Sequence, residues 1–176
     1  AKLRGSPKKP TIVLVHGLTG HMDEAMHYNA TRFFENHGFS VFRFNLYDWR
    51  KGARKLRGCL LETHGKDIDT VVEYLRKQGA KKIFAVGHSY GAPSILCSIK
   101  KDFQGVVFWD GSYLPRIVEF FNGFPYKKAL DGRILDEGYE VIIREDLVRE
   151  AKKLNALKLV KNLHVPLKVI VAGKGV

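Results

Sequence analysis

A serine with a glycine two residues away on each side stands near the middle of the chain, in the stretch IFAVGHSYGAPS, residues 83–94. An apolar run leads into GHSYG, residues 87–91, and a helical pattern follows it. A G-x-S-x-G motif between a strand and a helix predicts a nucleophile elbow, a tight turn that exposes a serine hydroxyl. The chemistry that it indicates is nucleophilic attack by Ser89 through a covalent intermediate.

Both glycines of the motif have a physical reason. The strand and the helix press together at such a turn, so a side chain at Gly87 or Gly91 would stand in the way. The turn holds the Ser89 hydroxyl at the N-terminus of the next helix, whose dipole favours developing negative charge. The N–H group of Tyr90 then points to the place where an oxyanion would form, so Tyr90 is a candidate oxyanion donor.

A second motif offers the other half of an oxyanion hole. The stretch VLVHGLTG places His16 and Gly17 directly after an apolar, β-branched run. In an elbow of this kind the loop after an earlier strand contributes a second N–H group, and Leu18 is the best candidate for it. A glycine-rich turn that only packs a helix on a strand is the alternative, but the two motifs in this order favour serine chemistry.

The elements that must position these residues alternate along the chain. Short apolar runs bounded by glycine or proline predict strands at 11–15, 39–45, 81–87, 105–110 and 165–173. Helical spacing predicts helices near 23–37 and 64–78 and directly after the elbow. This α/β alternation implies a mostly parallel sheet flanked by helices on both faces. The rhythm changes at 111–164, which we expect to form a small helical lid over the carboxyl edge of the sheet.

Taken together, these features resemble the α/β-hydrolase family, and most closely its small esterases and lipases. The resemblance covers nearly the whole chain: VLVHGLTG, GHSYGA, the strand GVVFW, the helical insertion and VPLKVIVAG. It implies a single α/β-hydrolase domain over 1–176 that is incomplete at its C-terminus. It also implies acyl transfer without a cofactor, in which a histidine deprotonates Ser89 and an acid orients the histidine. The N-terminal run AKLRG would be what is left of the antiparallel strands that precede the family's parallel ones.

The family's acid and base are absent from their usual places. The acid normally follows the strand LKVIVAG, but Val176 stands there, and the histidine normally comes after one more strand. We expect the last strand, the last helix and the catalytic histidine to lie beyond Val176, and loss of catalysis is the alternative. Some relatives use an acid from the preceding strand, which makes Asp110 a candidate. Asp110, Gly111 and Ser112 could equally form an Asx turn that ends the strand.

The charge and composition of the chain limit which kinds of partner and location it is expected to have. The chain has 30 Lys and Arg against 18 Asp and Glu, a net charge of +12. This surplus indicates either a solubilising surface, which is the simpler interpretation, or attraction for anionic substrates, membranes or nucleic acid. No nucleic-acid-binding motif, no apolar run of membrane-spanning length and no metal-ligand spacing is present in the sequence. Two distant cysteines and no visible secretory signal favour free thiols in the cytoplasm. The basic residues are densest at Arg50, Lys51, Arg54, Lys55 and Arg57.

The sequence thus predicts a cytoplasmic serine hydrolase that cleaves a small carboxylic ester, either neutral or anionic, through an acyl-enzyme on Ser89. Tyr90 and Leu18 would hold the oxyanion, Asp110 would orient the histidine, and neither a cofactor nor a metal would take part. Thioesterase and peptidase chemistry fit the same machinery. A non-catalytic binding protein on an α/β-hydrolase scaffold is the hypothesis from another class, because a fold does not fix a function.

Overall fold

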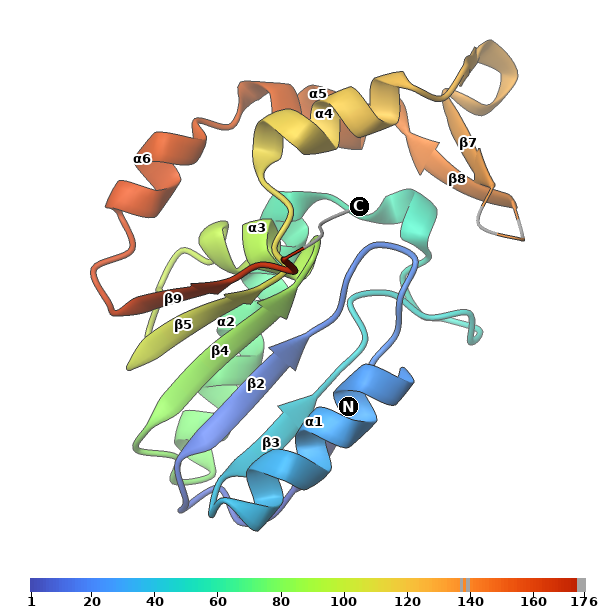
Figure 1. Ribbon diagram of the computed structural model, residues 1–176. Coiled ribbons are helices and arrows are strands. Elements are labelled where there is room, and N and C mark those ends of the chain that lie inside the picture. Colours follow the sequence, from blue (N-terminus) through green and yellow to red (C-terminus); the bar gives the residue numbers. More distant parts are fainter. Residues whose placement is uncertain (137, 139, 174–176) are drawn as a thin grey trace.

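A mostly parallel sheet forms the centre of the protein. The computed structural model describes residues 1–136, 138 and 140–173 (Figure 1). The six strands of the sheet lie in the order β1-β3-β2-β4-β5-β9, and only β1 is antiparallel to its neighbour. Both the parallel sheet and the short antiparallel strand from AKLRG are confirmed. The strands are β1 (Lys2–Arg4), β2 (Thr11–Val15), β3 (Ser40–Arg43), β4 (Ile83–His88), β5 (Gly105–Trp109) and β9 (Leu167–Ile170).

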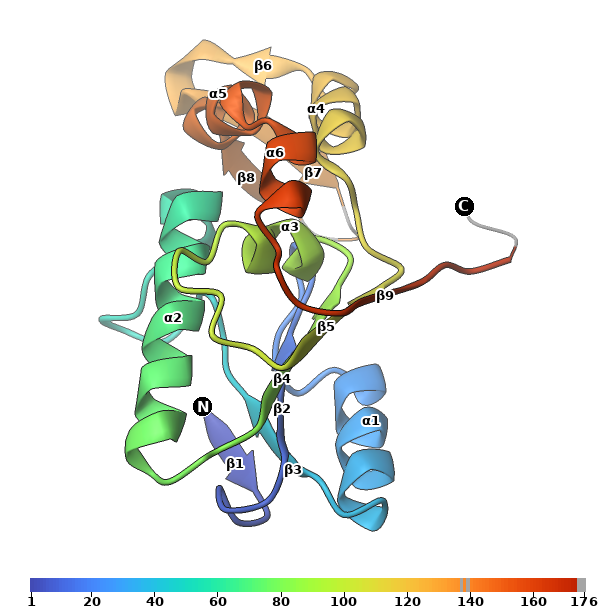
Figure 2. The same cartoon turned by 90° about the vertical axis from the view of Figure 1, so that its left-hand side faces the viewer.

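Helices cover both faces of this sheet. Helix α1 (Ala25–Asn36) lies on one face, and α2 (Leu61–Lys77) and α3 (Gly91–Leu96) lie on the other (Figure 2). Successive side chains of a strand point to opposite faces. In β2, Ile12 therefore packs in the cluster beneath α1, while Val13 packs in the larger cluster beneath α2 and α3. Because both faces of the sheet are covered, all five residues of β2 are buried.

Two helices differ from the sequence pattern, which puts Phe33 on the apolar face of the first and begins the second at residue 64. The buried side of α1 carries His27 and Thr31, whereas Phe33 is 58% exposed. Helix α2 begins three residues before the predicted start, so His64 is fully buried rather than at a helix end. The reason lies in tertiary packing: a Cβ at Gly65 would lie 2.2 Å from the carbonyl oxygen of Cys97, so α2 and the end of α3 touch there.

The segment between β5 and β9 contains a sheet as well as helices. Its strands pair as an antiparallel sheet in the order β6-β7-β8, where β-branched and apolar residues alternate with exposed ones. A purely helical insertion is therefore too simple a prediction. Among the described residues, no helix combines the length and the apolar character needed to cross a membrane. The elements are α4 (Leu114–Asn122), β6 (Tyr126–Lys127), β7 (Gly132–Asp136), β8 (Glu140–Arg144), α5 (Glu145–Lys153) and α6 (Ala156–Lys161), with short 3-10 turns at Leu56–Gly58 and Lys128–Leu130.

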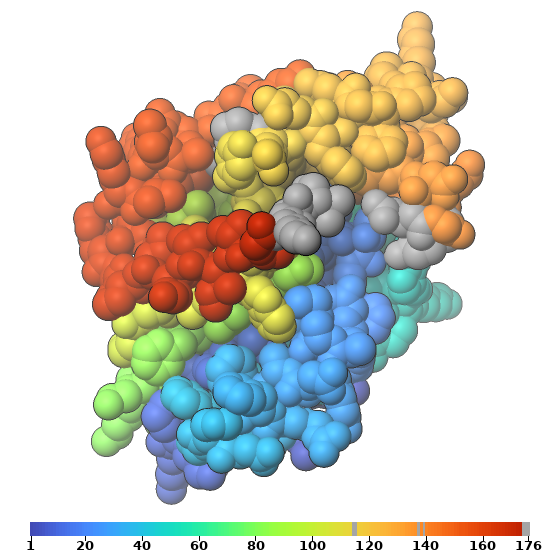
Figure 3. Space-filling model, in the orientation of Figure 1, coloured from blue at the N-terminus to red at the C-terminus, as the bar shows by residue number. Residues whose placement is uncertain are grey.

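The two sides of the main sheet differ in exposure. Strand β2 is buried throughout, whereas all four residues of β9 are exposed, including Val169 at 53% and Ile170 at 47%. In the space-filling view β9 crosses the surface as a red band below the gold and orange segment 111–164 (Figure 3). The carboxyl ends of β4, β5 and β9 thus meet beneath this segment.

Candidate active site

The turn after β4 has the geometry of a nucleophile elbow. Ser89 has a φ of 48°, which is strained for a residue with a side chain. A Cβ at Gly87 would lie 2.6 Å from the carbonyl carbon of Gly91, and a Cβ at Gly91 would lie 2.4 Å from the carbonyl oxygen of Val15. Only glycine fits at either position, because the clashing atoms belong to the backbone.

The His-Gly loop after β2 lies directly beside this elbow. A Cβ at Gly17 would come within 3.3 Å of the Cβ of Ser89. Within the part of the chain that the structure describes, the N–H groups of Leu18 and Tyr90 donate no hydrogen bond. Both residues line the same cavity as Ser89. The two N–H groups are therefore available next to the serine hydroxyl.

His16 holds the His-Gly loop in place. The N–H of Leu46 donates to Nε2 of His16 at 3.0 Å, so the ring proton is on Nδ1 and is donated to the carbonyl oxygen of Gly17 at 2.8 Å. Burial lowers the pKa of His16 from 6.5 to about 4. His16 is thus a neutral ring with both nitrogens occupied, and its part is to position the loop.

A second buried histidine supports the elbow from behind. The hydroxyl of Ser94 donates to the carbonyl oxygen of Tyr90 at 3.0 Å, and Nδ1 of His64 donates to that hydroxyl oxygen at 3.3 Å. Burial lowers the pKa of His64 from 6.5 to about 3. No sequence signal predicts this contact, since His64 and Ser94 are 30 residues apart and belong to no shared motif.

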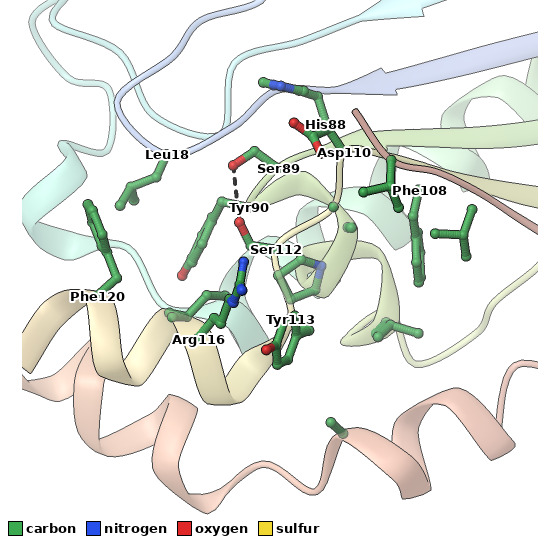
Figure 4. A pocket seen from close by; sticks show the side chains of 18 of the residues that line it. Leu18, His88, Ser89, Tyr90, Phe108, Asp110, Ser112, Tyr113, Arg116 and Phe120 are labelled. Atoms are coloured by element: carbon green, nitrogen blue, oxygen red, sulfur yellow. Dashed lines mark hydrogen bonds between the residues drawn. The ribbon is translucent and has the colours of Figure 1, made fainter. Parts of the chain in front are cut away.

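Asp110 follows β5 and lines the cavity together with Ser89 (Figure 4). Its φ is 47°, its N–H donates to the carbonyl oxygen of Ile170 at 2.7 Å, and its carboxylate accepts from the N–H of Ala172 at 3.5 Å. The alternative Asx turn is not formed, because the N–H of Ser112 donates to the carbonyl oxygen of Ser89 instead. Val176, at the family's usual acid position, lies outside the described residues.

The hydroxyl of Ser89 has a serine as its neighbour. Its Oγ lies 3.2 Å from Oγ of Ser112, shown as the dashed line in Figure 4. All seven histidines lie in the described part of the chain, and none of them forms a hydrogen bond with Ser89 Oγ there. The ring of His88 packs against Trp109 and His27, and burial lowers its pKa. A histidine beyond Val176 therefore stays a prediction.

A cavity of about 1080 Å³ opens in front of Ser89. The oxyanion loop, the elbow and β9 form one wall, and α4 and α6 of segment 111–164 form the other. Apolar side chains such as Phe108, Phe120 and Phe121 line much of it, and polar or charged residues, among them Ser89, Asp110, Ser112, Arg116 and Glu119, also line it. This combination is typical of a site for a small organic molecule.

Other reactive groups of the chain do not compete with Ser89. Cys59 and Cys97 are free, and burial raises the pKa of both thiols to about 12, so they stay protonated. Across residues 1–136, 138 and 140–173, no three His, Cys, Asp or Glu side chains are grouped so that they could hold a metal ion.

The basic loop after β3 is occupied by local contacts. Arg50 pairs with Asp48 and Arg54 pairs with Asp67, while Lys55 donates to the carbonyl oxygen of Asp48. None of its five basic residues is among those that line the cavity of Ser89 in the described structure. Most of this charge stabilises the loop itself.

Comparison with known proteins supports the fold. No family model and no curated protein matches the sequence. Among solved structures, the chain is similar to Est1E from Butyrivibrio proteoclasticus with bound ferulic acid (TM-score 0.80, 21% identity, 96% of this chain and 72% of that one). It is also similar to mouse alpha/beta hydrolase domain-containing protein 10 (0.70, 16%, 99% and 84%) and to a monoacylglycerol lipase from Paleococcus ferrophilus (0.68, 20%, 97% and 76%). The chain has the α/β-hydrolase fold.

Proposed function

We propose that the protein is a serine hydrolase that cleaves a small carboxylic ester through an acyl-enzyme on Ser89. The observation that carries this proposal is the strained turn at Ser89, which faces two available N–H groups at the edge of a cavity. Strained backbone conformations cluster at active sites and ligand clamps. The lipase and the ferulic-acid complex among the similar structures support an ester as the substrate.

The mechanism follows from these positions. Oγ of Ser89 attacks the carbonyl carbon while a base takes its proton, and the N–H groups of Leu18 and Tyr90 donate to the oxyanion that forms. The ester C–O bond then breaks, and the alcohol leaves with the proton from the base. Water attacks the acyl-Ser89 ester in the same way and releases the acid. Asp110 would hold the imidazole of the base in its productive orientation.

The domain around this site, its lid and its base are also part of the proposal. We take residues 1–176 as part of one α/β-hydrolase domain, with 111–164 acting as a lid. The contribution of α4 and α6 to the cavity wall supports that role. The base is expected to be a histidine after Val176, and a cytoplasmic location likewise stays a prediction.

Hydrolysis of 4-nitrophenyl acetate by the full chain tests the proposal. The unchanged protein should release 4-nitrophenolate, and Ser89→Ala should reduce the rate to the uncatalysed background. A second candidate, a non-catalytic binding protein, is favoured by one observation: the partner of Ser89 Oγ is Ser112 and not a histidine. Binding of the ester without turnover by the full chain would support that candidate and contradict the hydrolase.

A further inference from the structure

Arg116 brings a positive charge to the cavity of Ser89. It belongs to α4 and lines the cavity together with Ser89. In Figure 4 its guanidinium extends from α4 toward the hydroxyl of Ser112, which in turn lies 3.2 Å from Ser89 Oγ. It is the only Lys or Arg among the described residues that line this cavity.

The position of this guanidinium is not explained by an internal ion pair. In the described part of the chain Arg116 makes no salt bridge, whereas Arg43, Arg54 and Arg76 are each paired with an aspartate. Within the described residues its one specific contact is the face of the Tyr113 ring, with the central guanidinium carbon 5.6 Å from the ring centroid. A stacked guanidinium keeps its N–H donors free at its edge, where they fit a carboxylate in bidentate fashion.

Two carboxylates also line the cavity and must be weighed against this charge. Glu119 lies three residues further along α4, yet its carboxylate is not within 4.0 Å of Arg116. Asp110 is the acid proposed to hold the base, so its carboxylate would face the imidazole and not the substrate. Among the described residues that line the cavity, Arg116 is therefore the cationic side chain that a carboxylate can contact.

We propose that the cavity of Ser89 accepts an ester that carries a carboxylate group, and that Arg116 binds this group. The inference rests on the proposed hydrolase function and names its substrate class. It also replaces the basic loop as the source of any preference for anions, because none of the five basic residues of that loop is among the described residues that line the cavity. The carboxylate could lie on the acyl chain or on the alcohol, and matched esters distinguish the two.

The first test compares pairs of esters that differ in charge. For the acyl side, 4-nitrophenyl hemisuccinate is compared with the neutral 4-nitrophenyl butyrate. For the alcohol side, 4-acetoxybenzoate is compared with its methyl ester. Arg116→Gln should lower kcat/KM for the anionic member of one pair by about tenfold, the scale of a hydrogen bond to a charged group. The neutral member should change by less than about twofold, and the pair that responds identifies the side of the charge.

Arg57→Gln is the matched control. It removes the same charge from an exposed position in the basic loop, away from the cavity. We expect it to leave both members of each pair unchanged. If Arg116→Gln has the same effect on charged and neutral esters, or if Arg57→Gln reproduces its effect, the role of Arg116 is contradicted while the hydrolase function stands.

A binding measurement separates this inference from catalysis. In the Ser89→Ala background neither ester should turn over, so dissociation constants can be measured by isothermal titration calorimetry. Adding Arg116→Gln should weaken binding of the anionic ester of the responding pair by about tenfold and leave its neutral partner alone. Equal affinity with and without Arg116 would overturn the inference even if the protein proves to be a hydrolase. Weaker binding of the anionic ester alone would support the role of Arg116 even if the protein proves not to be a hydrolase.

Discussion

The serine side and the acid side of the candidate site are built in different ways. On the serine side, backbone touches backbone: Gly87 and Gly91 bring β4, α3 and β2 within distances that admit no side chain. The residues behind it, such as Val15 and His16, are almost completely buried. On the acid side, Asp110 is exposed and is held by two hydrogen bonds to the chain around β9, which is itself exposed.

This difference separates what a mutation should disturb. A close-packed backbone cannot adapt to an added atom, so changes on the serine side should act first on the stability of the fold. An exposed carboxylate contributes little to stability, so a change at Asp110 should act on chemistry alone. The distinction is wrong if mutations on the two sides change stability and catalysis in the same way.

The largest expected effect is on the acid side. Asp110→Asn should lower kcat for 4-nitrophenyl acetate by about 10⁴, the size of the same change in a known Ser-His-Asp triad. The free energy of unfolding in urea should change by less than about 0.5 kcal/mol. Asp136→Asn, an exposed carboxylate at the end of β7, is the control and should affect neither quantity. A loss of kcat below tenfold would return Asp110 to a purely structural part.

On the serine side the next largest effect concerns Gly91. A Cβ at this position would lie 2.4 Å from the carbonyl oxygen of Val15, so Gly91→Ala must push β2 and α3 apart. We expect the free energy of unfolding to fall by about 3 kcal/mol, measured by urea denaturation. Gly58→Ala is the matched control, because its Cβ would meet only the flexible side chain of Arg54 at 3.7 Å. Equal stability of the two variants would refute the close contact.

Acid should also weaken the serine side. The folded-state pKa values of His16 and His64 are about 4 and about 3, below the usual 6.5, because both rings are buried. At a pH between 6.5 and the folded-state pKa of either ring, that histidine binds a proton in the unfolded chain but not in the folded one. The free energy of unfolding should therefore be constant above about pH 6.5 and fall below it, by up to about 1.4 kcal/mol per pH unit for each histidine.

His64→Gln isolates one of these contributions. It should make the dependence of unfolding free energy on pH shallower between pH 6.5 and 4, whatever it does to stability at pH 7. His164→Gln, which removes an exposed ring, is the control and should keep the slope of the unchanged protein. An unaltered slope in the His64 variant would show that this ring is not kept neutral by burial.

The smallest effect is expected where the two sides meet. Ser112→Ala removes the hydroxyl that lies 3.2 Å from Ser89 Oγ. A neutral hydrogen bond contributes about 1 kcal/mol, so kcat/KM should change by about fivefold or less. Steady-state kinetics with 4-nitrophenyl acetate measure it. A loss as large as that of Ser89→Ala would instead make Ser112 part of the reaction.

The sequence predicts the serine side well because its signals are local. Strand β4, the GHSYG turn and the start of α3 are contiguous, and each glycine has one evident steric reason. The parallel direction of the strands follows from their alternation with helices. These features depend on neighbours along the chain, and neighbours are what a sequence displays.

The features that were missed depend on contacts between distant segments. The hydrogen bonds from His64 to Ser94 and from Ser94 to Tyr90 join α2 to α3, and neither residue type nor spacing predicts them. Phe33 continues the apolar pattern of α1 yet is exposed, because His27 and Thr31 occupy the buried side. The small sheet of β6, β7 and β8 was missed because its strands are short and lie between turns, where a helical stretch further on dominated the pattern.

Labelling of Ser89 by a fluorophosphonate probe tests the central claim most directly, because the probe reacts preferentially with a serine that is activated beside an oxyanion hole. In the full chain we predict one labelled site, located at Ser89 by mass spectrometry of the digested protein. Ser89→Ala should abolish labelling, and Ser112→Ala should retain it. A full chain that folds and binds esters but stays unlabelled, or a label that persists in Ser89→Ala, would contradict Ser89 as the nucleophile.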